Sequence, residues 1–119
     1  LIIIMKLNQK KMKKIMNNYF LYFSKKNIDK LNLIFSTNIQ LVDWTIKLKG
    51  KKNVLDFNKN LFKKFKKINI RINEKFYNFK KNSVACALTI KLDSKKIHVI
   101  DLIYLNSKFK IKKIIAYLR

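Results

Sequence analysis

The feature of this sequence that most limits its fold is a change in the spacing of apolar residues near residue 66. Before that point most of them recur every three or four positions, as in amphipathic helices, and one short segment alternates. After it they alternate with polar residues, as in strands. The helical segments are 10–24, one after Asn27 and one capped by Asn53. The alternating segments are 39–46, 68–72, 83–92, 97–105 and 109–118. The order helix, helix, strand, helix and four strands predicts an α+β fold.

The length of the chain suits one domain with its own core. The 119 residues are 49% hydrophobic, and no linker or internal repeat divides them. We expect residues 10–119 to form the domain and residues 1–9 to be disordered or an extra N-terminal overhang, since Met5 or Met12 can be the true start. A long antiparallel sheet with three helices on one side must curl to bury its apolar face, and this makes a cone with a pocket. Other α+β folds share this order of elements.

The net charge of +23 first suggests a nucleic-acid binder. However, 27 lysines accompany only two arginines, the residues that read phosphates and bases bidentately. Lysine, isoleucine, asparagine, phenylalanine and tyrosine dominate the chain, and AT-only codons encode all five. The lysines are also dispersed along helical patterns, as on solvated faces. We therefore expect no specific nucleic-acid site.

Single residues narrow the remaining classes of function. Cys86 is the only cysteine, which leaves no disulfide framework and favours a reducing compartment, the cytoplasm. The apolar stretch 1–5 is too short to span a membrane. Gly50 is the only glycine, so phosphate-binding glycine loops are absent. His98 is the only histidine and should face away from Asp101 on its strand, which disfavours a serine triad.

Several segments resemble ketosteroid isomerases and their SnoaL-like and nuclear transport factor 2-like relatives. The resemblance covers about residues 12–119. Its segments are Tyr19–Phe35, like the family's opening helix and acidic turn; Ile39–Trp44, like its "val-x-asp-pro" strand; Gly50 followed by helix 54–65; and Val99–Tyr104 and Lys110–Leu118, like its two closing strands. The chain departs from the pattern at two positions. Trp44 replaces the proline, and Asn58 stands where some isomerases have a tyrosine that supports the oxyanion hole.

The resemblance implies a cone-shaped curved sheet with three helices that enclose a pocket. It also implies three catalytic residues: Asp43 as general base, with Tyr19 and Asp101 as the donors of an oxyanion hole. In ketosteroid isomerases a neutral aspartic acid and a tyrosine bind the enolate oxygen while another aspartate moves the proton. The expected activity is therefore an intramolecular C=C shift that needs no cofactor and no metal.

The resemblance further implies the ligand and the partner. We expect an apolar small molecule with a ketone or similar oxygen, held in a pocket with walls at Trp44, Phe57, Ile103 and Ala116. We also expect a homodimer, because the outer face of the sheet is a common association surface in this superfamily. The alternative function is a non-catalytic ligand-binding or dimerisation module of the same fold.

The residues themselves are consistent with both the catalytic function and the non-catalytic module. Of six acids only Asp43 and Asp101 lie in predicted strands. Asp101 stands in an apolar run, where burial of a carboxylate is costly and the group should retain its proton. In the alternative reading Tyr19 is a core aromatic residue, Asp43 bonds to the backbone at a strand bend, and Asp101 is satisfied by local donors.

Overall fold

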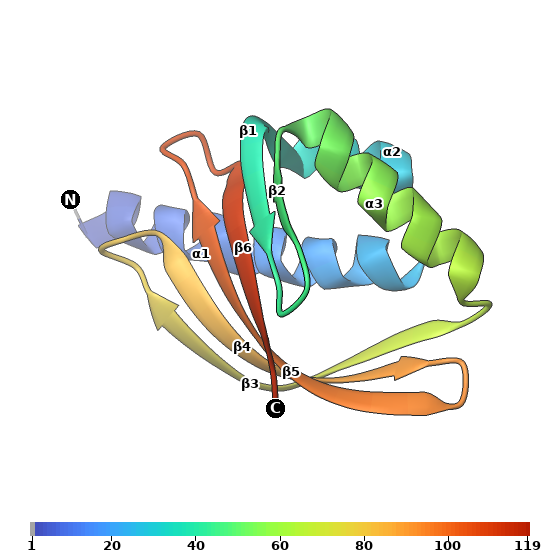
Figure 1. The fold of residues 1–119 in the computed structure, drawn as a ribbon. Coiled ribbons are helices and arrows are strands. Elements are labelled where there is room, and N and C mark those ends of the chain that lie inside the picture. Colours follow the sequence, from blue (N-terminus) through green and yellow to red (C-terminus); the bar gives the residue numbers. More distant parts are fainter. Residues whose placement is uncertain (1) are drawn as a thin grey trace.

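The computed structural model describes residues 2–119, which form three helices and six strands (Figure 1). The helices are α1 (Ile2–Ser24), α2 (Ile28–Ile34) and α3 (Lys51–Lys64). The strands are β1 (Phe35–Val42), β2 (Lys47–Lys49), β3 (Ile68–Asn78), β4 (Ser83–Leu92), β5 (Lys95–Leu105) and β6 (Ile111–Leu118). The fold is therefore α+β, as the change of apolar spacing predicts.

The six strands form one curved, open sheet in the order β2-β1-β6-β5-β4-β3. We expected an antiparallel sheet, but β1 runs parallel to β6, so the sheet is mixed. This parallel pair joins strands far apart in the sequence, since such strands need a long crossover rather than a hairpin. A bulge between Ile72 and Glu74 in β3 adds to the bend of the long strands, which curve beneath the helices (Figure 1).

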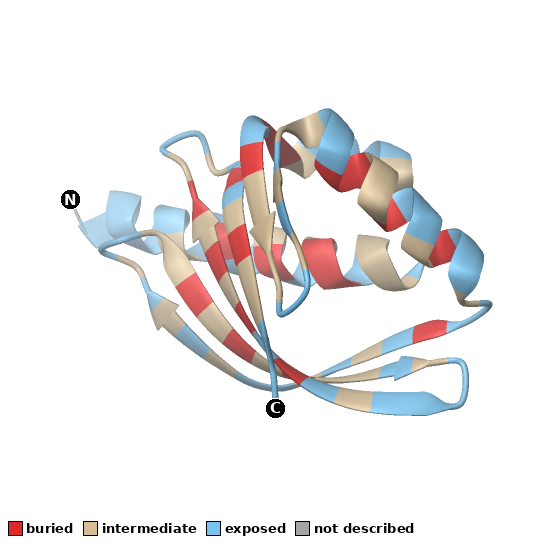
Figure 2. Ribbon diagram, viewed as in Figure 1, coloured by how far each residue is buried: buried red, intermediate tan, exposed pale blue. Residues whose placement is uncertain are grey.

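Helix α1 lies across the concave face of the sheet and supplies much of the core. Its residues Met12, Met16, Tyr19 and Phe20 are buried and recur at helical spacing. Figure 2 shows buried segments along the part of α1 that lies behind the sheet. The helix starts at Ile2, eight residues before the expected start. Residues 2–9 are therefore helical rather than disordered, and almost all of them are exposed, while Leu1 lies outside the described residues. Whether they belong to the domain remains a prediction.

The helix caps agree with the sequence in one case and differ in the other. Asn27 caps α2, because its Oδ1 accepts from the backbone N–H of Lys30 at 3.1 Å. Asn53 does not cap α3; the N-cap is Gly50, with φ 94°, and the Asn53 amide donates to the carbonyl of Lys49 at 2.9 Å. A backbone at this positive φ suits glycine, which lets the chain turn sharply from β2 into α3.

The convex face of the sheet carries apolar side chains without a cover. Ile100 pairs with Tyr117 and with Ala87 across neighbouring strands, and Phe76 of β3 pairs with Ala85. Phe76, Ile100 and Tyr117 are 62%, 39% and 54% exposed. His98, also exposed, lies on this face, which confirms that it points away from the buried Asp101.

Candidate functional site

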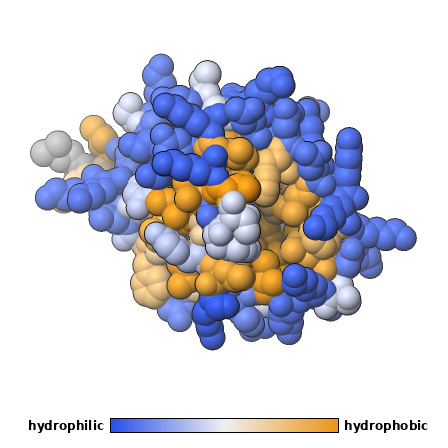
Figure 3. Space-filling model, in the orientation of Figure 1, coloured by the Kyte–Doolittle hydropathy of each residue, from blue (hydrophilic) through white to orange (hydrophobic). Residues whose placement is uncertain are grey.

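A cavity of about 180 Å³ lies between α1, α3 and the concave face of the sheet. Aromatic and aliphatic side chains form nearly all of its wall, and Figure 3 shows hydrophobic residues around the hollow on this side of the molecule. The polar groups at the wall belong to Tyr19, Asp43, Asn58 and Asp101. Although the chain carries 29 lysines and arginines, none of those in residues 2–119 lines the cavity. The site is thus apolar and free of cations.

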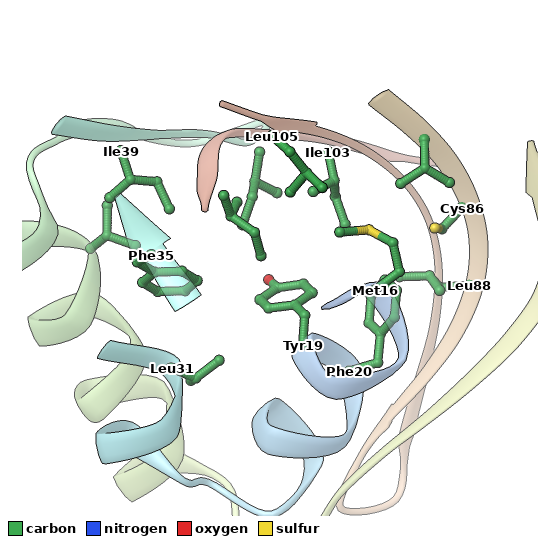
Figure 4. Close-up of a cluster of buried hydrophobic side chains, with 14 of the residues drawn as sticks. Met16, Tyr19, Phe20, Leu31, Phe35, Ile39, Cys86, Leu88, Ile103 and Leu105 are labelled. Atoms are coloured by element: carbon green, nitrogen blue, oxygen red, sulfur yellow. The ribbon is translucent and has the colours of Figure 1, made fainter. Parts of the chain in front are cut away.

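Tyr19 extends from α1 into the core near the cavity. Its ring lies 6.1 Å from that of Phe35 and 5.0 Å from that of Phe20, and Figure 4 shows it reaching from the helix toward Phe35. Burial, with smaller contributions from Asp101 and Cys86, raises the pKa of the Tyr19 hydroxyl well above its usual range. The hydroxyl therefore keeps its proton at neutral pH and can donate a hydrogen bond.

Asp101 lies on β5 between its register partners, Cys86 of β4 and Ala116 of β6. The residue is only 7% exposed, and burial raises the pKa of its carboxyl from 3.8 to about 7. The carboxyl lines the cavity and takes part in no side-chain hydrogen bond within residues 2–119. A large fraction of Asp101 is consequently neutral near pH 7, and its O–H can donate to a molecule in the cavity.

Asp43 follows the last residue of β1, where the chain turns toward β2. Its Oδ1 accepts from the backbone N–H groups of Thr45 and Ile46 at 2.7 and 2.8 Å, and from the Thr45 hydroxyl at 3.0 Å. This is the backbone bonding that the non-catalytic reading expects at a strand bend. Oδ2 makes no such bond within the described residues, and the side chain lines the cavity. Local bonds thus fix the carboxylate while one oxygen remains free.

Asn58 is the polar residue of the site to which sequence analysis gave no role. It lies on α3, is 4% exposed and lines the cavity, yet it makes no side-chain hydrogen bond within residues 2–119. Among residues 2–119 the fully buried side-chain polar atom without a partner is the Tyr77 hydroxyl, so the amide atoms of Asn58 are reachable from the cavity. A signal was available in the sequence, because Asn58 follows Val54 by one helical turn and interrupts the apolar face of α3.

The expected wall residues occupy different places. Trp44, Phe57 and Ala116 line the cavity, and Trp44, 48% exposed, lies where the wall reaches the surface. Ile103 does not line it. It is fully buried in the hydrophobic core, near Leu105 in Figure 4, because α1 covers that part of the concave face.

The turn between β4 and β5 is tied to the loop that leads from α3 to β3. The backbone N–H of Asp93 donates to the carbonyl of Lys67 at 2.9 Å, and the Lys67 N–H donates to Oδ1 of Asp93 at 2.8 Å. This reciprocal pair lowers the pKa of the Asp93 carboxyl, mainly through the bond from Lys67. Leu92 and Ile97 of this hairpin and Leu61 of α3 belong to the cavity wall, so the pair holds two sides of the wall together.

Residues 2–119 contain neither of two further kinds of site. Within 2–119, no three His, Cys, Asp or Glu side chains gather as they would around a metal ion. Over that same range no helix combines the length and apolar character needed to cross a bilayer.

The fold and the cavity define the class of protein: a cone-shaped α+β domain with an apolar pocket on the concave side of its sheet. No protein-family profile and no curated protein matches the sequence, but many solved structures share the fold. A SnoaL-like protein of Burkholderia thailandensis aligns at TM-score 0.81 and 11% identity, over 93% of this chain and 96% of its own. A nuclear transport factor 2-like protein of Cytophaga hutchinsonii gives 0.77 and 14%, over 91% and 89%. A provisionally named ketosteroid isomerase of Kribbella flavida gives 0.78 and 8%, over 92% and 78%. The similarity to this fold group is thereby confirmed.

Proposed function

We propose that the protein binds an apolar small molecule in this cavity and moves a proton α to its ketone, in the manner of ketosteroid isomerases and without a cofactor. The observation that carries the proposal is the meeting of Tyr19, Asp43 and Asp101 at one apolar cavity. Near pH 7 the Tyr19 hydroxyl holds its proton, a large fraction of the Asp101 carboxyl is protonated, and Asp43 offers an oxygen that no local bond uses. An apolar surrounding strengthens the hydrogen bonds that such groups make to a developing charge.

The proposed reaction is an isomerisation of a β,γ-unsaturated ketone. Asp43 removes a proton from the carbon between the carbonyl and the C=C bond, and the electron pair moves to the ketone oxygen, which gives a dienolate. The Tyr19 hydroxyl and the Asp101 carboxyl donate hydrogen bonds to that oxygen. Asp43 then returns the same proton to the γ carbon, so the double bond moves into conjugation. The reaction conserves all atoms and electrons, so it needs no oxidant, reductant or second substrate.

Turnover of a panel of β,γ-unsaturated ketones tests this proposal. We expect conjugated product to form, and Asp43→Asn to lower kcat roughly 10²- to 10⁴-fold, because a positioned base contributes about that much. The matched control is Asp29→Asn, since Asp29 is exposed on α2 and lies away from the cavity. If no ketone is turned over, or if Asp43→Asn is as active as the control, the catalytic reading fails.

A second candidate, a non-catalytic ligand-binding or dimerisation module, is favoured by different observations. Oδ1 of Asp43 already serves the turn at Thr45 and Ile46, and such a carboxylate has a structural use without chemistry. The exposed Phe76, Ile100 and Tyr117 on the convex face support a homodimer through this surface. Light scattering after gel filtration tests it: we expect a dimer that Tyr117→Lys converts to a monomer. A monomeric wild type would contradict the dimer.

The proposed location is the cytoplasm. Cys86, the only cysteine, is a buried free thiol, and a protein without disulfides suits a reducing compartment. Fractionation of the native cells, with the protein detected by antibody, would check this, and recovery from an oxidising compartment would contradict it.

A further inference from the structure

We infer that the cavity selects a single-ring ligand without negative charge that carries two oxygen functions, one bound by Tyr19 and Asp101 and the other by the amide of Asn58. This inference rests on the proposed function, because it assumes that a ketone oxygen occupies the Tyr19 and Asp101 end. It assigns Asn58 as a specificity-determining residue. Three observations carry it: the volume of the cavity, the charge of its wall and the unpaired amide.

The volume limits the ligand to about one ring. The cavity measures about 180 Å³, whereas a cavity of roughly 150 Å³ accommodates benzene and pockets for drug-sized molecules begin near 300 Å³. A benzene ring with a few substituent atoms therefore fits. Four fused rings do not fit without displacement of core side chains, and the walls belong to packed helices and paired strands that resist such displacement.

The wall charge excludes an anionic ligand. No lysine or arginine of residues 2–119 lines the cavity, although 29 of the 119 residues of the chain are lysine or arginine. A buried carboxylate or phosphate on a ligand would need such a partner, since an unpaired charge in an apolar site is costly. The groups at the wall instead fit uncharged oxygens, which accept from Tyr19 and Asp101.

The unpaired amide calls for a second polar group on the ligand. Asn58 is 4% exposed, lines the cavity and has no hydrogen-bond partner within the described residues. Tyr19, on α1, and Asp101, on β5, do not bond to it, so it is a separate binding point on α3. An amide can donate through Nδ2 and accept through Oδ1, so it matches a hydroxyl or a second carbonyl. A ligand hydroxyl or carbonyl at this point would pair the amide, whose atoms are reachable from the cavity.

The test compares ligands that differ by one hydroxyl. Calorimetric titration measures Kd for acetophenone, meta- and para-hydroxyacetophenone, and the tetracyclic ketone androstenedione. We expect at least one hydroxy isomer to bind the wild-type protein roughly three- to tenfold more tightly than acetophenone, the value of one hydrogen bond. We expect androstenedione to bind at least about tenfold more weakly than that isomer, because it exceeds the cavity.

Variants assign this preference to Asn58. Asn58→Leu has the same branched shape without the amide, and we expect it to reduce the preference for the hydroxy isomer to one or below. Asn58→Ala provides the same comparison if leucine disturbs folding, which circular dichroism checks. Asn60→Leu is the matched control, since Asn60 is exposed on the same helix and lies outside the cavity wall; it should keep the preference.

The outcomes separate this inference from the proposed function. If ketones bind or turn over but the hydroxyl brings no preference, or if the preference survives in Asn58→Leu, the role of Asn58 is overturned while the proposed function stands. Equal or tighter binding of androstenedione overturns the size limit. If none of the four ketones binds and no ketone is turned over, both proposals fall together.

Discussion

Asp101→Asn should make the protein more stable at neutral and alkaline pH. In the folded chain burial raises the pKa of this carboxyl to about 7, from an ordinary value of 3.8. The folded protein therefore holds this proton over a range in which the unfolded chain has lost it. The stability that this proton binding provides is fully present below 3.8 and is lost as the pH rises through about 7. Asparagine has nearly the same shape and does not titrate, so it avoids the loss.

The magnitude follows from the two pKa values. They differ by about 3 units, from 3.8 to about 7, and each unit corresponds to about 1.4 kcal/mol, which gives about 4 kcal/mol. Relative to wild type, Asp101→Asn should change stability little near pH 4 and add about 4 kcal/mol above about pH 8. Such a difference is a large part of the roughly 5 to 15 kcal/mol that stabilises a domain of this size.

The assay is urea unfolding followed by circular dichroism across this range, without ligand. Tyr19 on α1 and Cys86 on β4 are the titratable neighbours that couple to Asp101. Both remain neutral here, because burial raises the pKa of Cys86 to about 12 and that of Tyr19 well above its usual range. His98→Gln is the matched background, since His98 lies on the opposite face of β5 and should leave the difference intact. A difference that stays constant within about 1 kcal/mol over the whole range would refute the reasoning.

Three further predictions concern single residues. Tyr19→Phe should lower kcat on a ketone substrate roughly 10²- to 10³-fold, with little change in the urea midpoint because the hydroxyl makes no side-chain hydrogen bond within residues 2–119; equal activity to the Tyr22→Phe control would contradict the role of Tyr19. Gly50→Ala should destabilise the protein by about 1 to 3 kcal/mol in urea unfolding, from the positive φ alone, since an added Cβ meets no atom closer than 4.0 Å; an unchanged midpoint would contradict this. Cys86 should react with a disulfide reagent only on unfolding, because its thiol is buried and its pKa is raised to about 12; fast reaction of the folded protein would show that the thiol is accessible.

The order of elements could be predicted from apolar spacing, whereas details of the sheet could not. The alternation at Ile68, Ile70 and Ile72 predicts where β3 opens but not its end at Asn78, because the bulge before Glu74 shifts the alternation and breaks the pattern in the sequence. The three-residue strand β2 is too short to leave any pattern. The parallel pairing of β1 with β6 depends on contacts between distant segments, about which local spacing carries no information.

The site could be anticipated only in part, and for a similar reason. Tyr19, Asp43 and Asp101 were selected by resemblance, and all three line the cavity; their chemical roles stay predictions. Asn58 received no role because an asparagine on a helix is usually a surface residue, and its burial depends on how α3 packs over the sheet. The resemblance places Ile103 at the pocket. The sequence does not indicate how far α1 covers that part of the concave face, and this cover puts Ile103 in the core.

The bonds between Asp93 and Lys67 have a consequence for how ligands come and go. They couple the far hairpin to the end of α3, so those two walls must move as one body and cannot part to widen the entrance. The opposite rim is the turn between the paired strands β1 and β2, where the indole of Trp44 is largely exposed to solvent. If the cavity binds a ligand as proposed, trimming this ring should shorten the residence time of the ligand more than it alters its rate of capture.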